Sequence, residues 1–396
     1  MVELFFYLLV LFAIAALMQV DFLFSILYLF FGVVVFSRLW ARRALAHVRI
    51  ERRYHDRAFL GEVVPVTLRV HNTSRLPLIW LQVHESLPID LISPNFFRQV
   101  VSLGPRGQAD LGYALRCRRR GYYTLGPLTM ATSDLFGFEE NTARWSRDEH
   151  MTVYPEIVPL GKIGLPSVSP FVSLPSGPRL FEDPARVIGV RDYYAGDSPR
   201  HINWKTSAAV GTLLVKKYEP AIALDTMIFL DLYRPGYDTR TRYWASELAI
   251  VAAASIANHL TERRQSVGLT TNGLDPLGEE TTIPRPLPTH HGRAHLMHIL
   301  DILARVEVAD TQPVTMLLSR QRPELPWGAT LLIIAGRESE GLLDAILSAR
   351  HAGFPVVLVL TDDSAPLGPV EQQHEMLSVP VYRLSVSDDL KTLFEL

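Results

Sequence analysis

The 396-residue sequence is poor in cysteine, and Cys117 is the single example. A lone cysteine excludes an intrachain disulfide and a zinc site built from several thiolates, and it is typical of a protein in a reducing compartment. An excess of positive charge is also lacking, since 39 Lys and Arg stand against 41 Asp and Glu. A strongly basic domain or stripe is the usual mark of nucleic-acid binding, so no nucleic-acid partner is predicted.

Widespread catalytic signatures are missing as well. The sequence contains no G-x-x-x-x-G-K-[ST] phosphate loop, no G-x-G-x-x-G after a strand and no G-x-S-x-G. Cys117 lies among the four arginines of segment 116–120, where no neighbouring residue marks it as a nucleophile. We interpret this charged segment as a solvated strand end. No catalytic residue and no cofactor are predicted.

Apolar residues are abundant at the N-terminus. Residues 2–36 are almost wholly apolar, and Gln19-Val20-Asp21 divides them into two arms, 4–18 and 22–36. One continuous helix of this length would run about 50 Å, well beyond the roughly 30 Å hydrocarbon core of a bilayer. We therefore predict that residues 1–46 form a transmembrane helical hairpin with a basic flank.

The cations that begin at Arg38 place this flank in the cytoplasm. Two spans would put both chain ends and the soluble domains on the cytoplasmic side of the cell membrane. A single span with the N-terminus outside is the alternative. A cleaved signal peptide is disfavoured, because the first residues carry no Lys or Arg.

Residues 47–158 are predicted to form a β-sandwich of the immunoglobulin-like kind. Short runs such as Val63–Val70 alternate apolar and polar residues, and glycine and proline turns separate the runs. Residues 159–190 are rich in Pro, Ser and Gly, which predicts a linker without helix.

Residues 191–396 are predicted to form an α/β domain. After Glu219, short apolar runs alternate with helical patterns, which is typical of a mainly parallel sheet covered on both faces. Asp231 follows the first run, at the edge of the sheet where ligands bind in such folds. The helix expected over 242–263 has Trp244 on its apolar side.

Four histidines, His290, His291, His295 and His298, invite a metal hypothesis. The last three would lie on one side of a helix. There is no H-E-x-x-H arrangement, so a zinc-protease site would lack its general base. We interpret these histidines as solvent-facing or helix-start residues.

The densest polar and aromatic cluster is RDYYAGDSPRHINW, residues 191–204. Asp197-Ser198-Pro199 predicts a helix start with Asp197 as N-cap, and Gly211 predicts its end. In a structural interpretation, the charges form a clasp and Trp204 packs the helix onto the sheet. In a functional interpretation, the cluster contacts a partner protein. The candidate contact residues are Arg191, Tyr193, Tyr194, Gly196, Asp197, Arg200, Asn203, Trp204 and Lys205.

The spacing R-x-Y-x-x-G-D-x-x-R-x-I-N-W resembles the signature of the bacterial family called domain of unknown function 58. The resemblance covers nearly the whole chain and includes segments 134–137 and 153–155. It implies a membrane-anchored cytoplasmic protein with a von Willebrand A-like C-terminal half. It also implies association with a MoxR-type AAA+ ATPase, as an adaptor or assembly factor for client proteins.

The chain departs from that family at two places. Asn203 stands where members often have Asp, and Asp231 is followed by Tyr233 and Pro235 in place of the two hydroxyls of a D-x-S-x-S metal motif. We therefore predict no metal. The expected function is that of a non-catalytic, membrane-tethered adaptor for a MoxR-type ATPase and an unidentified client. The alternative is an enzyme at the cytoplasmic membrane face, with its site near Asp231, Arg234 and residues 290–298.

Overall fold

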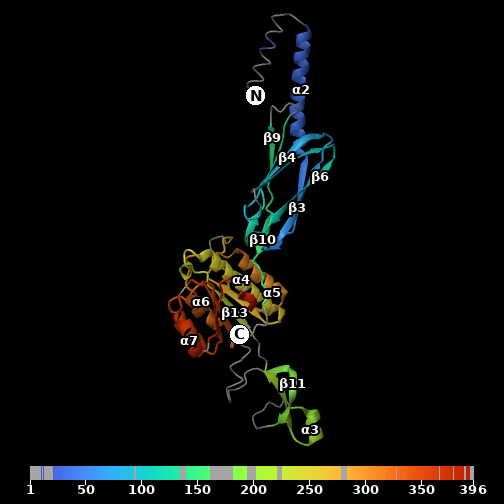
Figure 1. Ribbon diagram of the computed structural model, residues 1–396. Helices are drawn as coiled ribbons and strands as arrows, with labels where there is room; N and C mark the ends of the chain where they lie inside the picture. Colours follow the sequence, from blue (N-terminus) through green and yellow to red (C-terminus); the bar gives the residue numbers. More distant parts are fainter. Residues whose placement is uncertain are drawn as a thin grey trace. The chain divides into compact units, whose positions relative to one another are not determined.

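A computed structural model gives the architecture of the chain (Figure 1). The structure describes residues 10, 12, 21–92, 95–133, 140–160, 182–193, 202–220, 225–277, 283–326, 328–364, 366–377, 379–387 and 389–392. The chain divides into two compact units. The first comprises residues 1–156 with 300–306, and the second comprises 157–299 with 307–396.

The first unit is a β-sandwich preceded by a long helix (Figure 1). Its strands pair in three sheets with the orders β1-β3-β6, β2-β10-β7 and β5-β4-β8-β9. All pairs are antiparallel except β2 with β10. The elements are α2 (Asp21–Ala46), β1 (Val48–Arg53), β2 (Arg57–Phe59), β3 (Val63–Asn72), β4 (Leu78–Ser86), β5 (Phe96–Leu103), β6 (Gln108–Arg116), β7 (Gly121–Thr124), β8 (Leu128–Ser133), β9 (Glu140–Trp145) and β10 (His150–Tyr154).

The predicted transmembrane hairpin is wrong. Among the described residues, no helix is long and apolar enough to cross a membrane. Of the first predicted arm, only Val10 and Phe12 are described. The second arm lies in α2, but that helix continues through Arg38 and Arg42 toward β1. Its last turns belong to the sandwich, since the Trp40 indole N–H donates to the Pro77 carbonyl at 2.8 Å.

The sandwich core follows from the two-residue period of its strands. In β3, alternate residues from Val64 to Val70 are buried while the residues between them are more accessible. Leu68 and Val70 pack with residues of β1, β4 and β8, and Leu45 at the end of α2 joins the same cluster. A second cluster contains Val64, Val66 and residues of β10. The alternation is therefore sufficient to place this core.

A buried ion pair, Arg52 with Glu85, lies inside the sandwich. The Arg52 guanidinium donates to the carboxylates of Glu85 and Glu149, and the Tyr113 hydroxyl donates to Glu85 at 2.8 Å. Arg52 also lies 5.3 Å from the ring centre of Trp145. Burial raises the pKa of Glu85, and the nearby Arg52 opposes that shift. The network thus connects β1, β4 and β6 with the segment before β10.

The second unit begins with a two-stranded antiparallel ribbon. Its strands β11 (Glu182–Asp192) and β12 (Leu214–Pro220) flank helix α3 (Trp204–Val210). We call residues 182–193 and 202–220 the motif module.

The rest of the second unit is an α/β domain with the strand order β15-β14-β13-β16-β17-β18. Every pairing is parallel except that of β14 with β15. The elements are β13 (Thr226–Leu230), η3 (Arg234–Gly236), α4 (Arg242–Glu262), β14 (Val267–Thr271), β15 (Leu287–His290), α5 (Arg293–Arg305), α6 (Val314–Gln321), η4 (Arg322–Glu324), β16 (Thr330–Ala335), α7 (Leu342–His351), β17 (Val356–Leu360), α8 (Pro369–Gln372), α9 (His374–Leu377), β18 (Val381–Arg383) and α10 (Asp389–Thr392).

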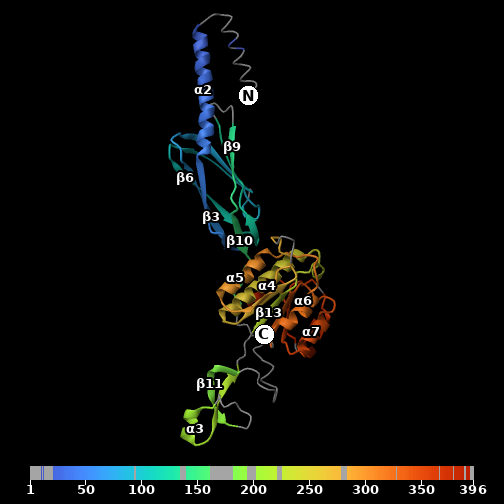
Figure 2. The ribbon, with the colours of Figure 1, turned by 180° about the vertical axis from the view of Figure 1, so that it is seen from behind.

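Helices cover both faces of this sheet (Figures 1 and 2). Met227 and Phe229 of β13 pack with α6 and α7 on one face. Side chains alternate along a strand, so Ile228 and Leu230 point to the opposite face, where α4 contacts β13, β14 and β16. Full burial of β13, β14 and β17 explains why these strands are continuous apolar runs.

The Arg52 network generates a test of the sandwich. Arg52→Met leaves Glu85 buried without its cationic partner, which should lower the free energy of unfolding by about 3–5 kcal/mol. Arg53→Met is the matched control, because Arg53 is 55% exposed and pairs with Glu51 at the surface. Its effect should be within about 1 kcal/mol. Urea unfolding followed by circular dichroism measures both, and equal effects of the two substitutions would contradict the assigned role of Arg52.

Candidate functional site

The carboxyl ends of β13, β14 and β17 meet at one edge of the parallel sheet, which is where ligands of such sheets bind. Each strand is followed closely by a polar residue: Asp231 after β13, Asn272 after β14 and Asp362 after β17. All three side chains are buried. The geometry of these residues decides what this edge can do.

Asp231 and Asn272 form a hydrogen-bonded pair. The Asn272 side-chain amide donates to Asp231 Oδ1 at 2.6 Å and to the Gln312 carbonyl at 2.7 Å. Its own Oδ1 accepts from the Leu232 N–H at 2.6 Å. Asp231 Oδ1 also accepts from the Tyr233 N–H at 3.0 Å. One amide side chain therefore fixes the loop after β13 to the end of β14.

Burial controls the charge of Asp231. The residue is 1% exposed, and among the described residues its Oδ2 has no hydrogen-bond partner. Burial raises the pKa of this carboxyl from 3.8 to about 6, while the hydrogen bonds from Asn272 and Tyr233 oppose the shift. Such a carboxyl titrates in a mildly acidic range but is inaccessible to a dissolved substrate.

Asp362 is buried too, but it is well satisfied. It accepts from Thr241 Oγ1 at 3.1 Å, from Ser364 Oγ at 2.6 Å and from the Asp238 N–H at 3.3 Å. Burial raises the pKa of Asp362, but these hydrogen bonds outweigh burial and leave it below its ordinary value. Asp362 thus serves to fix the loop before α4 to the end of β17.

This edge does not fit a divalent cation. Magnesium and calcium need several oxygen ligands, but the side chains of Tyr233 and Pro235 replace the hydroxyls that would follow Asp231. The Arg337 guanidinium lies at the same loop and donates to the Pro235 carbonyl at 2.5 Å. Within the described ranges, no group of three His, Cys, Asp or Glu residues is placed to hold a metal ion.

Of the four histidines, His295 packs against the outer part of the sheet, whereas His290, His291 and His298 are exposed. His295 on α5 is half-buried, and its Nε2 lies 2.8 Å from the Val267 carbonyl of β14. Burial lowers the pKa of His295. Its ring contacts His290 of β15 with 5.4 Å between ring centres. His295 is therefore a packing residue of the α/β domain.

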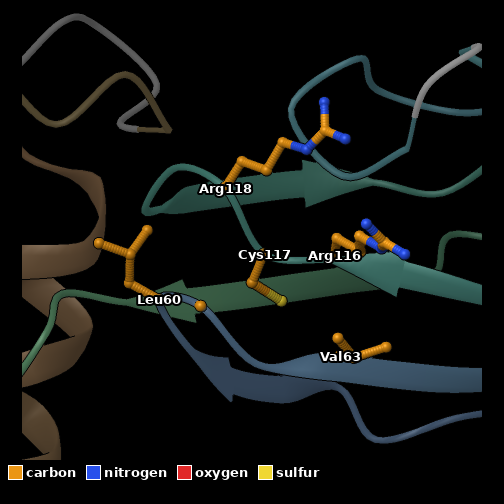
Figure 3. A pocket seen from close by; sticks show the side chains of 6 residues that line it. Leu60, Val63, Arg116, Cys117 and Arg118 are labelled. Atoms are coloured by element: carbon orange, nitrogen blue, oxygen red, sulfur yellow. The ribbon is translucent and has the colours of Figure 1, made fainter.

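A hollow of about 440 Å³ lies at one end of the sandwich, around Leu60, Val63 and Cys117 (Figure 3). Figure 3 shows that the guanidinium groups of Arg116 and Arg118 end apart, so they form no common anion site. Burial raises the pKa of the Cys117 thiol to about 11, which keeps it protonated and unreactive at neutral pH.

The structure describes part of the predicted contact set. Tyr194, Gly196, Asp197 and Arg200 lie outside the described residues. Arg191 and Tyr193 are at the end of β11 and just after it. The Tyr193 N–H donates to the Leu213 carbonyl at 3.0 Å.

Helix α3 starts later than predicted. Its N-cap is Asn203, whose side chain accepts from the Thr206 N–H at 3.3 Å, because Ile202 still pairs with Val215 as extended chain. The predicted end is confirmed, since Gly211 has φ 81° and lies in the left-handed region.

Two tryptophans lie on the surface against expectation. Trp204 is 65% exposed, so the predicted packing of its ring is not found. Within the motif module, Ile202, Leu214 and Val215 are buried, whereas Val210 and Leu213 are exposed like Trp204. Lys205 is exposed beside Trp204. The module therefore has a small interior and exposes several apolar side chains together with Lys205.

Trp244 is the second of them. It was expected on the apolar side of its helix, yet it is 75% exposed in the first turn of α4. Sequence reasoning also missed Asn272 and Asp362. The sequence contained a signal for both residues, because each is a polar residue that closely follows a buried strand, as Asp231 does.

The buried carboxyl of Asp231 generates a pH test. Because its pKa is higher in the folded protein than in the unfolded chain, it favours folding at low pH. That contribution is lost as the pH rises from about 4 to about 6. A shift from 3.8 to about 6 corresponds to about 3 kcal/mol. Asp231→Asn removes the charge and should gain stability relative to wild type by about this amount over that range.

Urea unfolding at about pH 3.5 and about pH 7.5, followed by helical circular dichroism, measures this difference. If the variant differs from wild type by the same amount at both pH values, Asp231 does not carry the proton.

Comparisons with known proteins find one relative, solved structures and one family that are similar to all or part of this chain. The chain is 23% identical over 353 residues to the uncharacterized protein YeaD of Bacillus subtilis (strain 168), covering 87% of this chain and 83% of YeaD. The CARDB domain of the PF1109 protein from Pyrococcus furiosus matches 27% of this chain and 91% of its own length, with 16% identity and a TM-score of 0.20. A beta-glucosidase from Listeria innocua matches 27% of this chain and 16% of its own, with 13% identity and a TM-score of 0.17. Residues 189–324, from β11 to η4, match the family described as "Protein of unknown function DUF58".

Proposed function

We propose that the protein is a non-catalytic adaptor that binds a MoxR-type AAA+ ATPase and an unidentified client. The observation that carries this proposal is the exposed apolar surface of the motif module. Trp204, Val210 and Leu213 all lie exposed within this small module. Exposed apolar patches mark interaction sites, and tryptophan is among the residues most enriched at binding hot spots.

The build of the module supports a binding role. A two-stranded ribbon alone is marginally stable in water. Here the Ser207 hydroxyl accepts from the Leu214 N–H at 2.9 Å and so holds α3 against the start of β12. The buried set of Ile202, Leu214 and Val215 is small. A partner that covers Trp204 would complete the core of this module.

The α/β domain is proposed to be von Willebrand A-like and to serve as a platform. Its strand order, with β13 and β16 in the interior, supports this assignment. The burial of Asp231 at the edge of the sheet argues against the alternative of an enzyme with its active site there. The carboxyl is 1% exposed, and Asn272 and the Tyr233 N–H already occupy its Oδ1.

We also propose that the adaptor works at the cytoplasmic face of a bilayer. Helix α2 supports this proposal, because Phe22, Leu29, Phe31 and Phe36 are exposed along it. Transfer of apolar and aromatic side chains from water into the interface of a lipid bilayer is favourable. Arg42 and Arg43 follow on the same helix and suit anionic headgroups.

Removal of the Trp204 ring tests the proposal. In the full chain, Trp204→Ala should lower capture of a purified MoxR-type ATPase about tenfold or more, because truncation of a hot-spot aromatic costs about 2 kcal/mol or more. Lys205→Glu should also lower capture of the ATPase, because it reverses the charge next to Trp204 on the same surface. Ile79→Ala is the control, since Ile79 is an equally exposed apolar residue on β4 of the sandwich.

Pull-down of the ATPase at a fixed salt concentration is the measurement, with circular dichroism to check each fold. The proposal fails if the wild-type chain captures no ATPase, or if Trp204→Ala captures as much as wild type.

A further inference from the structure

The start of α4 forms an aromatic and basic corner, which we define as residues 240–244. Trp244 is 75% exposed and Tyr243 is 44% exposed, and their rings meet edge to face with 5.2 Å between centres. Arg240 is exposed next to them. Tryptophan, tyrosine and arginine are the residues most enriched at protein-binding hot spots. Residues 240–244 contain Arg240 and Arg242 and no acidic residue, so the corner is basic.

A hollow of about 520 Å³ lies between the loops that follow β16 and β17. Leu343 and Leu367 contribute apolar walls, and Leu367 is 61% exposed. Glu340 lies exposed at the rim. Glu338 forms one wall and accepts from the Val370 and Glu371 N–H groups, both at 2.8 Å. Arg337 also lines the hollow, but its guanidinium donates to the Pro235 carbonyl, and the two carboxylates outnumber it. The hollow therefore has apolar walls and a border that is acidic on balance, which is the chemical complement of the corner.

The corner and the hollow lie at the same edge of the sheet. The corner and the segment just before it contact the loop after β17, since the Thr241 hydroxyl and the Asp238 N–H both donate to Asp362. The loop after β13 also contacts the loop after β16, where the Arg337 N–H donates to the Gly236 carbonyl at 3.1 Å. One fixed edge thus presents two complementary surfaces side by side.

We infer that this edge binds a second copy of the same chain. A twofold axis between the corner and the hollow places Trp244 of each copy in the hollow of the other, with Arg240 opposite Glu340. Such a contact is isologous, because each copy gives and receives the same interaction. The hollow has the volume of an ordinary ligand pocket, which accommodates an indole ring. The contact needs no ATPase, so it stands apart from the proposed adaptor role.

The first experiment uses two full-length copies with different affinity tags, co-expressed and solubilised together. Wild-type copies should co-purify, and Trp244→Ala in both should lower co-recovery about tenfold or more, since each pair loses two anchors. Met316→Ala is the matched control, an exposed apolar residue on α6 of the same domain, and should leave co-recovery unchanged. The inference is overturned if wild-type copies do not co-purify, or if Trp244→Ala copies do so as well as wild type.

A charge exchange tests the pairing itself. Arg240→Glu alone or Glu340→Arg alone places like charges opposite each other in both contacts and should lower co-recovery. When one copy carries Arg240→Glu and the other Glu340→Arg, the new carboxylate meets the new guanidinium, and the second contact keeps its native pair. Co-recovery should then return to near the wild-type value. If the mixed pair is no better than either single variant, the second copy is not seated in this way.

Discussion

The hydrogen bond between Asn272 and Asp231 is the interaction on which the α/β domain depends most. Parallel strands end with backbone groups that their own sheet leaves unpaired, and buried groups of that kind must find partners. The Asn272 side chain pairs with two such backbone groups, the Leu232 N–H and the Gln312 carbonyl, and it also donates to the Asp231 carboxylate. It therefore converts the edge that in related topologies receives a ligand into an internal polar centre. The buried Asn272 side chain also holds the loops of this edge in place. The outer surface of the edge is therefore rigid enough to bind another protein.

The elements of this domain could be predicted well from the sequence, and its surface could not. Apolar runs at β13, β16 and β17 are long enough to indicate buried parallel strands. Trp244 shows the limit of that approach. Helical periodicity predicts which side of a helix is apolar, but it does not predict which turns of the helix extend beyond the core. The start of α3 shows another limit. Asp197 and Asn203 are equally good caps by residue type, and the pairing of Ile202 with Val215 decides between them.

The prediction of an N-terminal transmembrane hairpin was wrong for a related reason. Apolar composition predicted where lipid would be favourable, but it did not predict that α2 runs on into the sandwich. The contact of Trp40 with the Pro77 carbonyl depends on residues far apart in the sequence. The buried Arg52 is a similar case, because nothing in segment 48–53 indicates that one of its arginines is interior. Its partners Glu85 and Glu149 come from other parts of the chain.

Gly368 has a mechanical consequence. A side chain at this position would overlap the Glu338 carboxylate, since an added Cβ would lie 2.3 Å from it. Glu338 in turn bonds the backbone of Val370 and Glu371, and its neighbour Arg337 bonds Gly236. The loops after β17, β16 and β13 are thus connected in series by hydrogen bonds. A displacement of the loop after β17 would therefore be passed through Glu338 to the loop after β16, and through Arg337 to the loop after β13.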